Sequence, residues 1–186
     1  SIYLTKGTHT ISFLSLREPM LIHELILGNA EEAKSYEQVK ADWDAAGAKA
    51  TSGKVITIEG ENAARTSSQM LYPIQDQSSP SVSPASAKEL LNNTVGGNSW
   101  RLVGQWIEWE FDTPESGYYN ISLYDCQNFV RGIYVSRRIS IDGQVPFKEM
   151  EAYGFHYEQS WREDVLSDDA GTPYSFYLEE GHHTIR

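Results

Sequence analysis

The most reactive side chains of this sequence lack the spacing of a catalytic or metal site. His182 and His183 are adjacent, so in a strand they would point to opposite faces, whereas two histidines on one helix face bind a metal when they are four residues apart. Cys126, the single cysteine, has no catalytic signature around it, and the chain contains neither a Gly-x-Ser-x-Gly motif nor a phosphate-binding glycine loop. We therefore expect that the protein is not an enzyme.

Acidic residues offer one regular pair. Glu59 and Glu61 follow the β-branched run VITI and are separated by one residue, so strand alternation would place both carboxylates on one side of the chain. The group Asp164, Asp168 and Asp169 lacks the spacing of an EF-hand loop and suits turns instead. Carboxylate pairs for glycoside hydrolysis are defined by a separation in space of about 5–10 Å, which sequence spacing does not give.

Composition limits the classes of partner. The chain has 186 residues, of which 40% are hydrophobic and 12% aromatic, which is enough for one sizeable core, or one core and part of another. A net charge of −11 repels phosphate backbones and anionic membrane surfaces. No apolar run of about 18 residues is present, and the start lacks the pattern of a signal peptide. We expect no nucleic-acid partner, no membrane insertion and no disulfide framework.

One helix is predicted near the start. Ser35 with Gln38, or Asn29 with Glu32, suits a capping box, and Gly47 suits the helix end. Between these signals, apolar residues at spacings of three and four form a single stripe, made of Tyr36, Val39, Trp43 and Ala46. The stripe indicates a surface helix that connects two parts of the chain, and packing against a core is its ordinary role.

The rest of the chain reads as short strands separated by Gly and Pro. Residues 107–111 alternate, and a Pro-Glu-Ser-Gly turn leads into residues 119–123, which predicts an antiparallel hairpin. Further turns are expected at Asp142-Gly143, near Gly171 and at Gly181. Residues 2–27 read as a hairpin, and a strand begins at Val55. This pattern predicts an all-β fold, a β-sandwich with one short connector helix.

The first and last segments of the chain have similar sequences. SIYLTKGTHTIS aligns with YLEEGHHTIR, with Gly7 on Gly181 and His9 on His183. Residues 1–28 are therefore expected to be the terminal strands of a preceding related module, residues 29–53 a helical connector, and residues 54–186 the second module. Alternatively, residues 1–27 fold back and supply the closing strands of the second module, as in a permuted jelly roll.

Several stretches together resemble a known family. These are Glu59-Gly60-Glu61-Asn62, GGNSW, WIEWEF, a Pro-x-x-Gly-Tyr turn, IDG and a closing Gly-x-His-Thr-Ile strand. Their order resembles the galactose-binding-like jelly rolls of carbohydrate-binding module families 6 and 35. The longer stretches GGNSWRLVGQWIEWEFDTPESGYYNIS and SRRISIDGQVPFKEMEAYGF look like the modules attached to extracellular solute-binding proteins of Gram-positive sugar ABC transporters.

The resemblance implies a calcium site. In those modules an acidic pair on the first strand and an acid on the last strand bind a structural calcium ion, which prefers oxygen ligands. Glu59 and Glu61 match the first pair. At the last-strand position this chain carries His23 with Glu24 beside it, and histidine is a poor calcium ligand. The alternative is that the two glutamates are solvated or paired with arginines.

The resemblance also implies an extracellular or cell-surface protein that binds an oligo- or polysaccharide and works beside neighbouring domains of its own chain. A sugar ring stacks on an exposed aromatic face, and polar groups bind its hydroxyls. The candidate ligand residues, on expected loops, are Tyr72, Trp100, Asn128, Arg131 and Trp161. Trp106 faces away from the Ile107 set, and its role is open. The rival function is a structural spacer or protein-interaction jelly roll without a glycan site.

Overall fold

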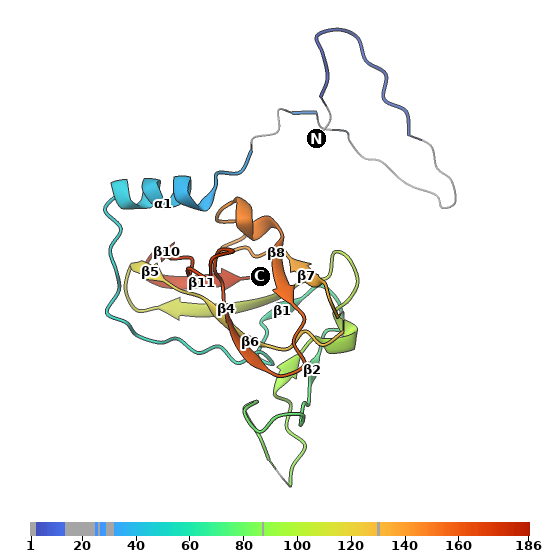
Figure 1. Cartoon of the computed structure of the whole chain (residues 1–186), viewed down its shortest axis with the longest axis vertical. Coiled ribbons are helices and arrows are strands. Elements are labelled where there is room, and N and C mark those ends of the chain that lie inside the picture. Colours follow the sequence, from blue (N-terminus) through green and yellow to red (C-terminus); the bar gives the residue numbers. More distant parts are fainter. Residues whose placement is uncertain (1–2, 14–24, 26, 29–31, 87, 130) are drawn as a thin grey trace. The chain divides into compact units, whose positions relative to one another are not determined.

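The structure is a computed structural model of residues 1–186 that describes all of them except 1–2, 14–24, 26, 29–31, 87 and 130. The chain divides into two units, residues 1–33 and residues 34–186 (Figure 1). No helix among the described residues is long and apolar enough to cross a bilayer.

The described residues of the first unit contain no strand. Tyr3 to Phe13 are all exposed, and the His9 ring lies 2.7 Å from the Thr5 carbonyl oxygen. The first part of the predicted terminal hairpin is therefore not a strand, since nothing within this unit's described residues pairs with its backbone. The later apolar run, with His23 and Glu24, lies outside the described residues.

The second unit is built mainly of short antiparallel strands. Its helices are α1 (Tyr36–Ala45) and the 3-10 helices η1 (Gly97–Ser99) and η2 (Lys148–Glu151). Its strands are β1 (Arg65–Thr66), β2 (Pro73–Ile74), β3 (Thr94–Val95), β4 (Ile107–Thr113), β5 (Gly117–Tyr119), β6 (Ser122–Asp125), β7 (Tyr134–Arg137), β8 (Tyr153–His156), β9 (Arg162–Val165), β10 (Phe176–Leu178) and β11 (Gly181–Ile185). The sheets are β1-β4-β11, β5-β10, β2-β3, β6-β9 and β7-β8. These sheets, with a single α-helix among the described residues, agree with an all-β fold, and the jelly-roll sandwich stays a prediction.

Four of the strands form one bent antiparallel ribbon. β4 pairs with β11 up to the Thr113–Gly181 pair, and beyond the bend β5 pairs with β10, where Gly117 faces Leu178. The Thr113 hydroxyl lies at the bend and donates to the carbonyl oxygens of Glu179 and Gly181. This bend carries the chain from one small sheet to the next (Figure 1).

The predicted hairpin between residues 107–111 and 119–123 is wrong in its pairing. Both segments contain strands, but β4 pairs with β1 and β11, and β5 pairs with β10. Alternation identifies a strand and its packed face, whereas the partner of the strand depends on segments distant in sequence. The expected two-residue turn at Asp142-Gly143 is confirmed, because both residues have positive φ, 52° and 75°, and Ile141 pairs with Gln144.

Helix α1 forms as the sequence predicts. Gln38 N–H donates to the Ser35 hydroxyl, and Ser35 N–H donates to the Gln38 side chain, which completes the capping box. Gly47 follows the helix with φ of +89°, a conformation that glycine adopts without strain. The earlier start at Asn29 lies outside the described residues.

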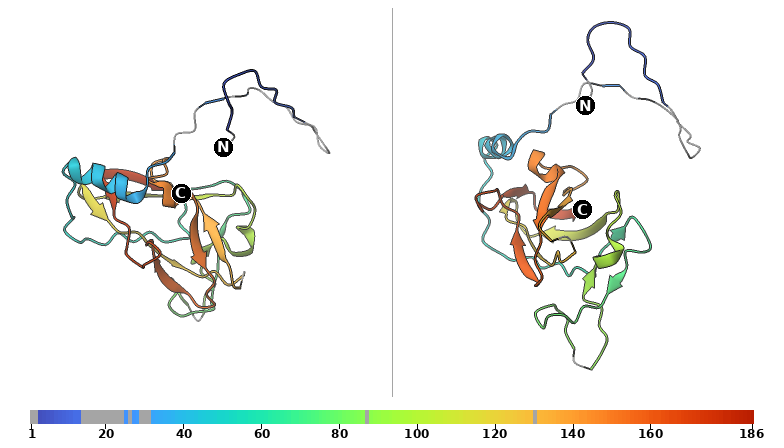
Figure 2. Two further views of the ribbon diagram at one scale, coloured as in Figure 1. Left: turned by 45° about the horizontal axis from the view of Figure 1, so that its top comes forward. Right: turned by 45° about the vertical axis from the view of Figure 1, so that its right-hand side comes forward.

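Helix α1 belongs to the second unit and lies beside β5 and β10 (Figure 2). Tyr36, Val39 and Trp43 pack against the hydrophobic core, and the Tyr36 hydroxyl accepts a hydrogen bond of 3.0 Å from Ser175 N–H. The buried core beneath consists of Ile139, Ile141, Phe147, Met150, Phe155, Leu166, Tyr174, Phe176 and Leu178. The predicted apolar stripe is therefore a packing surface, which fixes the position of Trp43.

The strand expected from Val55 is not formed. Residues 52–59 carry no strand assignment, and the Val55 side chain is 88% exposed. A turn follows in which Asn62 N–H donates to the Glu59 carbonyl oxygen. A β-branched segment is a strand only where another strand satisfies its backbone groups, and none lies alongside this one in the described part of the chain.

Candidate functional site

Two aromatic rings stack at one end of the β6-β9 ribbon. Tyr124 lies on β6 and Trp161 directly precedes β9, with ring centroids 5.8 Å apart and ring planes at 22°. The Tyr124 hydroxyl is 2.6 Å from the Ser81 hydroxyl, and Trp161 Nε1 donates to the Ser78 hydroxyl at 3.1 Å. The stack is therefore held in one orientation by the serine-rich loop, and Tyr124 is 46% exposed.

The strand register explains why these rings meet. Tyr124 faces Glu163 across the ribbon, so alternation places Trp161, two residues before Glu163, on the same side. Glu163 is exposed and supplies a carboxylate on this face. We call Tyr124, Trp161 and Glu163, with Ser78 and Ser81, the stack site.

Loops on the same end bring Asn128 near this region. The loop after β6 and the loop before β9 are joined by a hydrogen bond of 2.9 Å from Glu158 N–H to the Gln127 carbonyl oxygen. Asn128 and Arg131 lie in the first of these loops and are exposed, and Trp161 ends the second. Of the sequence-predicted ligand residues, these three share one end of the strands.

The opposite face of the ribbon carries charged residues. Asp125 faces Arg162, and an Arg162 nitrogen is 3.0 Å from the Asp164 carboxylate. Burial, with the charge of Asp164, raises the pKa of Asp125 to about 6, although Arg162 acts in the other direction. Nε of Arg162 is buried and has no hydrogen-bond acceptor among the described residues. This face therefore carries an incompletely satisfied polar cluster.

Cys126, next along the chain, shows no sign of activation. Its sulfur lies 3.6 Å from the carbonyl oxygens of Glu158 and Gln159. Burial, followed by the charges of Asp125, Asp76 and Glu158, raises the pKa of the thiol. A thiolate is the nucleophilic form of cysteine, so this environment works against nucleophilic chemistry.

The structure places Trp100 and Tyr72 elsewhere. The Arg137 guanidinium lies over the Trp100 ring, 4.6 Å from its centroid, and donates to the Trp100 carbonyl oxygen at 3.3 Å. Arg137 is the last residue of β7 and pairs with Tyr153 of β8. The loops of the stack site adjoin the other end of this strand pair. Tyr72, 55% exposed, precedes β2, and no ring contact among the described residues joins it to Trp100 or Trp161. The three predicted aromatic residues therefore do not form one cluster.

The predicted calcium ligands lie at a turn. Glu59 and Glu61 belong to the turn that closes at Asn62, and Oε2 of Glu61 is buried without a hydrogen-bond partner among the described residues. Calcium takes six to eight oxygen ligands, and no group of three or more His, Cys, Asp or Glu side chains converges in the described part of the chain. These two residues alone do not fit a calcium shell, and the calcium site stays a prediction.

An arginine-paired glutamate does exist, at a position the sequence analysis did not single out. Glu108 is 4% exposed and accepts hydrogen bonds from Arg65 Nε at 2.6 Å and Arg186 Nη2 at 2.7 Å. Burial acts to raise its pKa, but the bonds from Arg186 and Arg65 outweigh burial and lower it. Arg186 also lies over the Trp106 ring, 3.9 Å from its centroid, so one face of that ring is occupied.

His182 and His183 point to opposite faces of β11, as the sequence predicts. His182 is exposed beside Asp112 at 3.3 Å, whereas His183 is buried.

Comparisons of the chain with protein-family models, with curated proteins and with solved structures find no match. The geometry of the described residues therefore carries the functional argument alone.

Proposed function

We propose that the protein is a non-catalytic carbohydrate-binding domain of an extracellular sugar-capture or glycan-active protein, and that its ligand stacks on Tyr124 and Trp161. The observation that carries this proposal is the stacked ring pair, in which Tyr124 is exposed and Trp161 is half-buried, and whose polar tips are fixed by Ser81 and Ser78. A pyranose presents an apolar C–H face, and a ring held in place before binding loses little conformational entropy on binding.

Polar partners for sugar hydroxyls surround this stack. Glu163 offers an exposed acceptor on the same face, and Asn128 offers both a donor and an acceptor in the adjoining loop. In this proposal Arg131 contributes at the loop rim. The jelly-roll arrangement, the cell-surface location and a structural calcium ion belong to the same proposal through the family resemblance.

A glycan and polysaccharide binding screen on the whole chain tests the function. It should detect dissociation constants as weak as about 1 mM and be run with calcium and with a chelator. We expect one class of polysaccharide to bind, and we expect Trp161→Ala or Tyr124→Ala to abolish this binding. Tyr3→Ala, which removes an exposed tyrosine of the first unit, is the matched control and should bind normally.

The rival function is a structural spacer or protein-interaction domain. The contact between Arg137 and Trp100 favours this rival, because the guanidinium covers one face of that ring. Absence of binding across the screen, with the protein folded, would support the spacer. Equal binding by the wild type and both aromatic variants would keep a sugar function but move it away from the stack site.

A further inference from the structure

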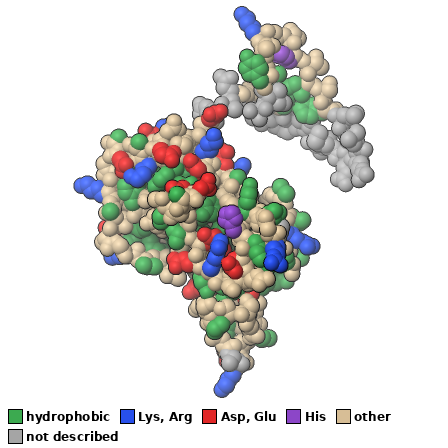
Figure 3. All heavy atoms as spheres, in the orientation of Figure 1, with side chains coloured by type: hydrophobic (Ala, Val, Ile, Leu, Met, Phe, Trp, Pro, Cys, Tyr) green, Lys and Arg blue, Asp and Glu red, His purple; other side chains and the backbone are tan. Residues whose placement is uncertain are grey.

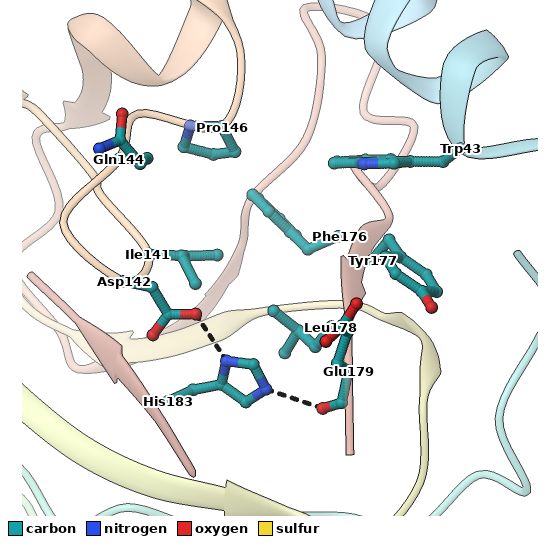
Figure 4. Close-up of a pocket in the computed structure, with 10 residues that line it drawn as sticks. All are labelled: Trp43, Ile141, Asp142, Gln144, Pro146, Phe176, Tyr177, Leu178, Glu179 and His183. Atoms are coloured by element: carbon teal, nitrogen blue, oxygen red, sulfur yellow. Dashed lines mark hydrogen bonds and ion pairs between the residues drawn. The ribbon is translucent and has the colours of Figure 1, made fainter. Parts of the chain in front are cut away.

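A pocket of about 280 Å³ lies between helix α1 and the Asp142-Gly143 turn, outside the stack site (Figure 4). Trp43 and Pro146 lie on one side of it, and Asp142, His183 and Glu179 lie on the other. Phe176 and Leu178 come between them. The pocket thus joins aromatic and aliphatic walls to a polar edge, which is the usual composition of a small-ligand site.

The polar edge carries excess negative charge. His183 Nδ1 is 2.7 Å from the Asp142 carboxylate, and Nε2 is 2.7 Å from the Glu179 carbonyl oxygen. Both partners are acceptors, so the protonated ring, which has a proton on each nitrogen, satisfies both of them. Even with His183 protonated, its single positive charge stands against two carboxylates that line the pocket, those of Asp142 and Glu179, and no Lys or Arg lines it.

The two carboxylates are not equivalent. Both oxygens of Asp142 are occupied, one by His183 and the other by Thr184 N–H at 2.8 Å. The Glu179 side chain makes no hydrogen bond within the described residues, and it is exposed. The unmatched negative charge of the pocket therefore resides on Glu179.

Two aromatic rings line the same pocket as Glu179. Trp43 and Tyr177 have ring centroids 6.5 Å apart, with planes at 41°. Trp43 is held by α1, whose position is fixed by the Tyr36 contacts with the core. Aromatic ring faces carry partial negative charge and attract cations, and quaternary ammonium groups are the ligands that such walls recognise best.

We propose that this pocket binds a small organic cation of the alkylammonium class. Glu179 supplies the opposite charge, Trp43 and Tyr177 supply ring faces, and the volume of about 280 Å³ admits a ligand with only a few carbon atoms. The proposal does not depend on glycan binding at the stack site, because the residues of the two sites are different.

Choline and its neutral carbon isostere, 3,3-dimethyl-1-butanol, are the probes. Each is titrated into the full chain at constant ionic strength, and the indole N–H signal of Trp43 is followed by NMR after assignment with Trp43→Phe. We expect choline to shift this signal with saturation below about 50 mM, and the neutral isostere to bind at least about tenfold more weakly.

Matched variants locate the charge. Glu179→Gln should weaken choline binding about tenfold, whereas Glu180→Gln, which neutralises the adjacent exposed acid outside the pocket, should leave it unchanged. The proposal fails if the isostere binds as well as choline, if both variants bind alike, or if choline leaves the Trp43 signal in place. A neutral methyl pyranoside that saturates the same signal more tightly than choline would also overturn it, and would indicate a second sugar site.

Discussion

At the scale of single residues, the stability of the fold depends on the protonation of His183. Burial disfavours the charged ring, but the bond to the Glu179 carbonyl and the bond to Asp142 outweigh it, so the pKa of His183 is raised. A neutral imidazole has one donor only and would leave one of the two acceptors facing a lone pair. The protonated form therefore stabilises the fold where β11 meets the Asp142-Gly143 turn.

The sign of the pH effect follows from this shift. Because the folded pKa is above the ordinary value of 6.5, the stabilisation is complete below pH 6.5 and is lost as the pH rises through the folded pKa. We expect His183→Gln to lower the free energy of unfolding by about 1–3 kcal/mol at pH 6, with a smaller difference at high pH. Urea unfolding of wild type and variant across pH measures this.

His182→Gln is the control for that experiment, since His182 lies on the exposed face of the same strand. It should change the unfolding free energy little at any pH. A wild type whose excess stability over His183→Gln grows with rising pH would contradict the protonated state assigned to His183.

At the scale of elements, residues 49–51 lie against β5, one strand of the bent ribbon. Tyr118 N–H donates to the Lys49 carbonyl oxygen at 2.9 Å, and Ala50 forms a bridge with Tyr118, so this segment lies against β5. Gly117 is at the closest approach. A Cβ added there would be 2.6 Å from the Lys49 carbonyl oxygen and 2.7 Å from the Thr51 methyl group.

We therefore expect Gly117→Ala to destabilise the second unit by about 1–3 kcal/mol, because backbone atoms must move to accept the methyl group. Gly60→Ala is the matched control, since a Cβ there meets nothing within 4 Å and the glycine does not have positive φ. Thermal or urea unfolding of both variants gives the comparison. Equal stability of the two would show that residues 49–51 do not pack against β5.

At the scale of the whole molecule, the described residues of the second unit form a buried core. Every residue of the buried cluster, and the helix that packs on it, belongs to residues 34–186. On the surface of this unit, acidic side chains are spread among exposed hydrophobic ones (Figure 3), in keeping with the net charge of −11. Both the stack site and the pocket at Trp43 lie within this unit.

Removal of residues 1–33 tests the two sequence hypotheses about the repeated ends. If residues 1–28 belong to a preceding module, the shortened protein should unfold in urea with an unchanged free energy, because every described residue of the second unit's buried core lies after residue 33. If residues 1–27 instead supply closing strands, the free energy should fall by several kcal/mol through lost burial, roughly 0.8 kcal/mol per buried CH₂ group. We expect the first result.

Local signals in the sequence determined the elements whose stability is local. The capping box of Ser35 and Gln38, the glycine after α1 and the Asp142-Gly143 turn all depend on residues a few positions apart, so sequence reading predicts them. Alternation likewise predicts that His182 and His183 point to opposite faces.

Only the tertiary structure decided the rest, because strand pairing and polar partners come from residues far apart in the chain. In the folded chain β4 pairs with β11, Val55 is exposed without a partner strand, and the arginine ion pairs form with Glu108. The strand register also places Tyr124 against Trp161, whereas Trp100 packs against Arg137. The sequence supplies the residue types that can bind a ligand, and the fold selects which of them meet, since each contact is set by packing across the whole domain.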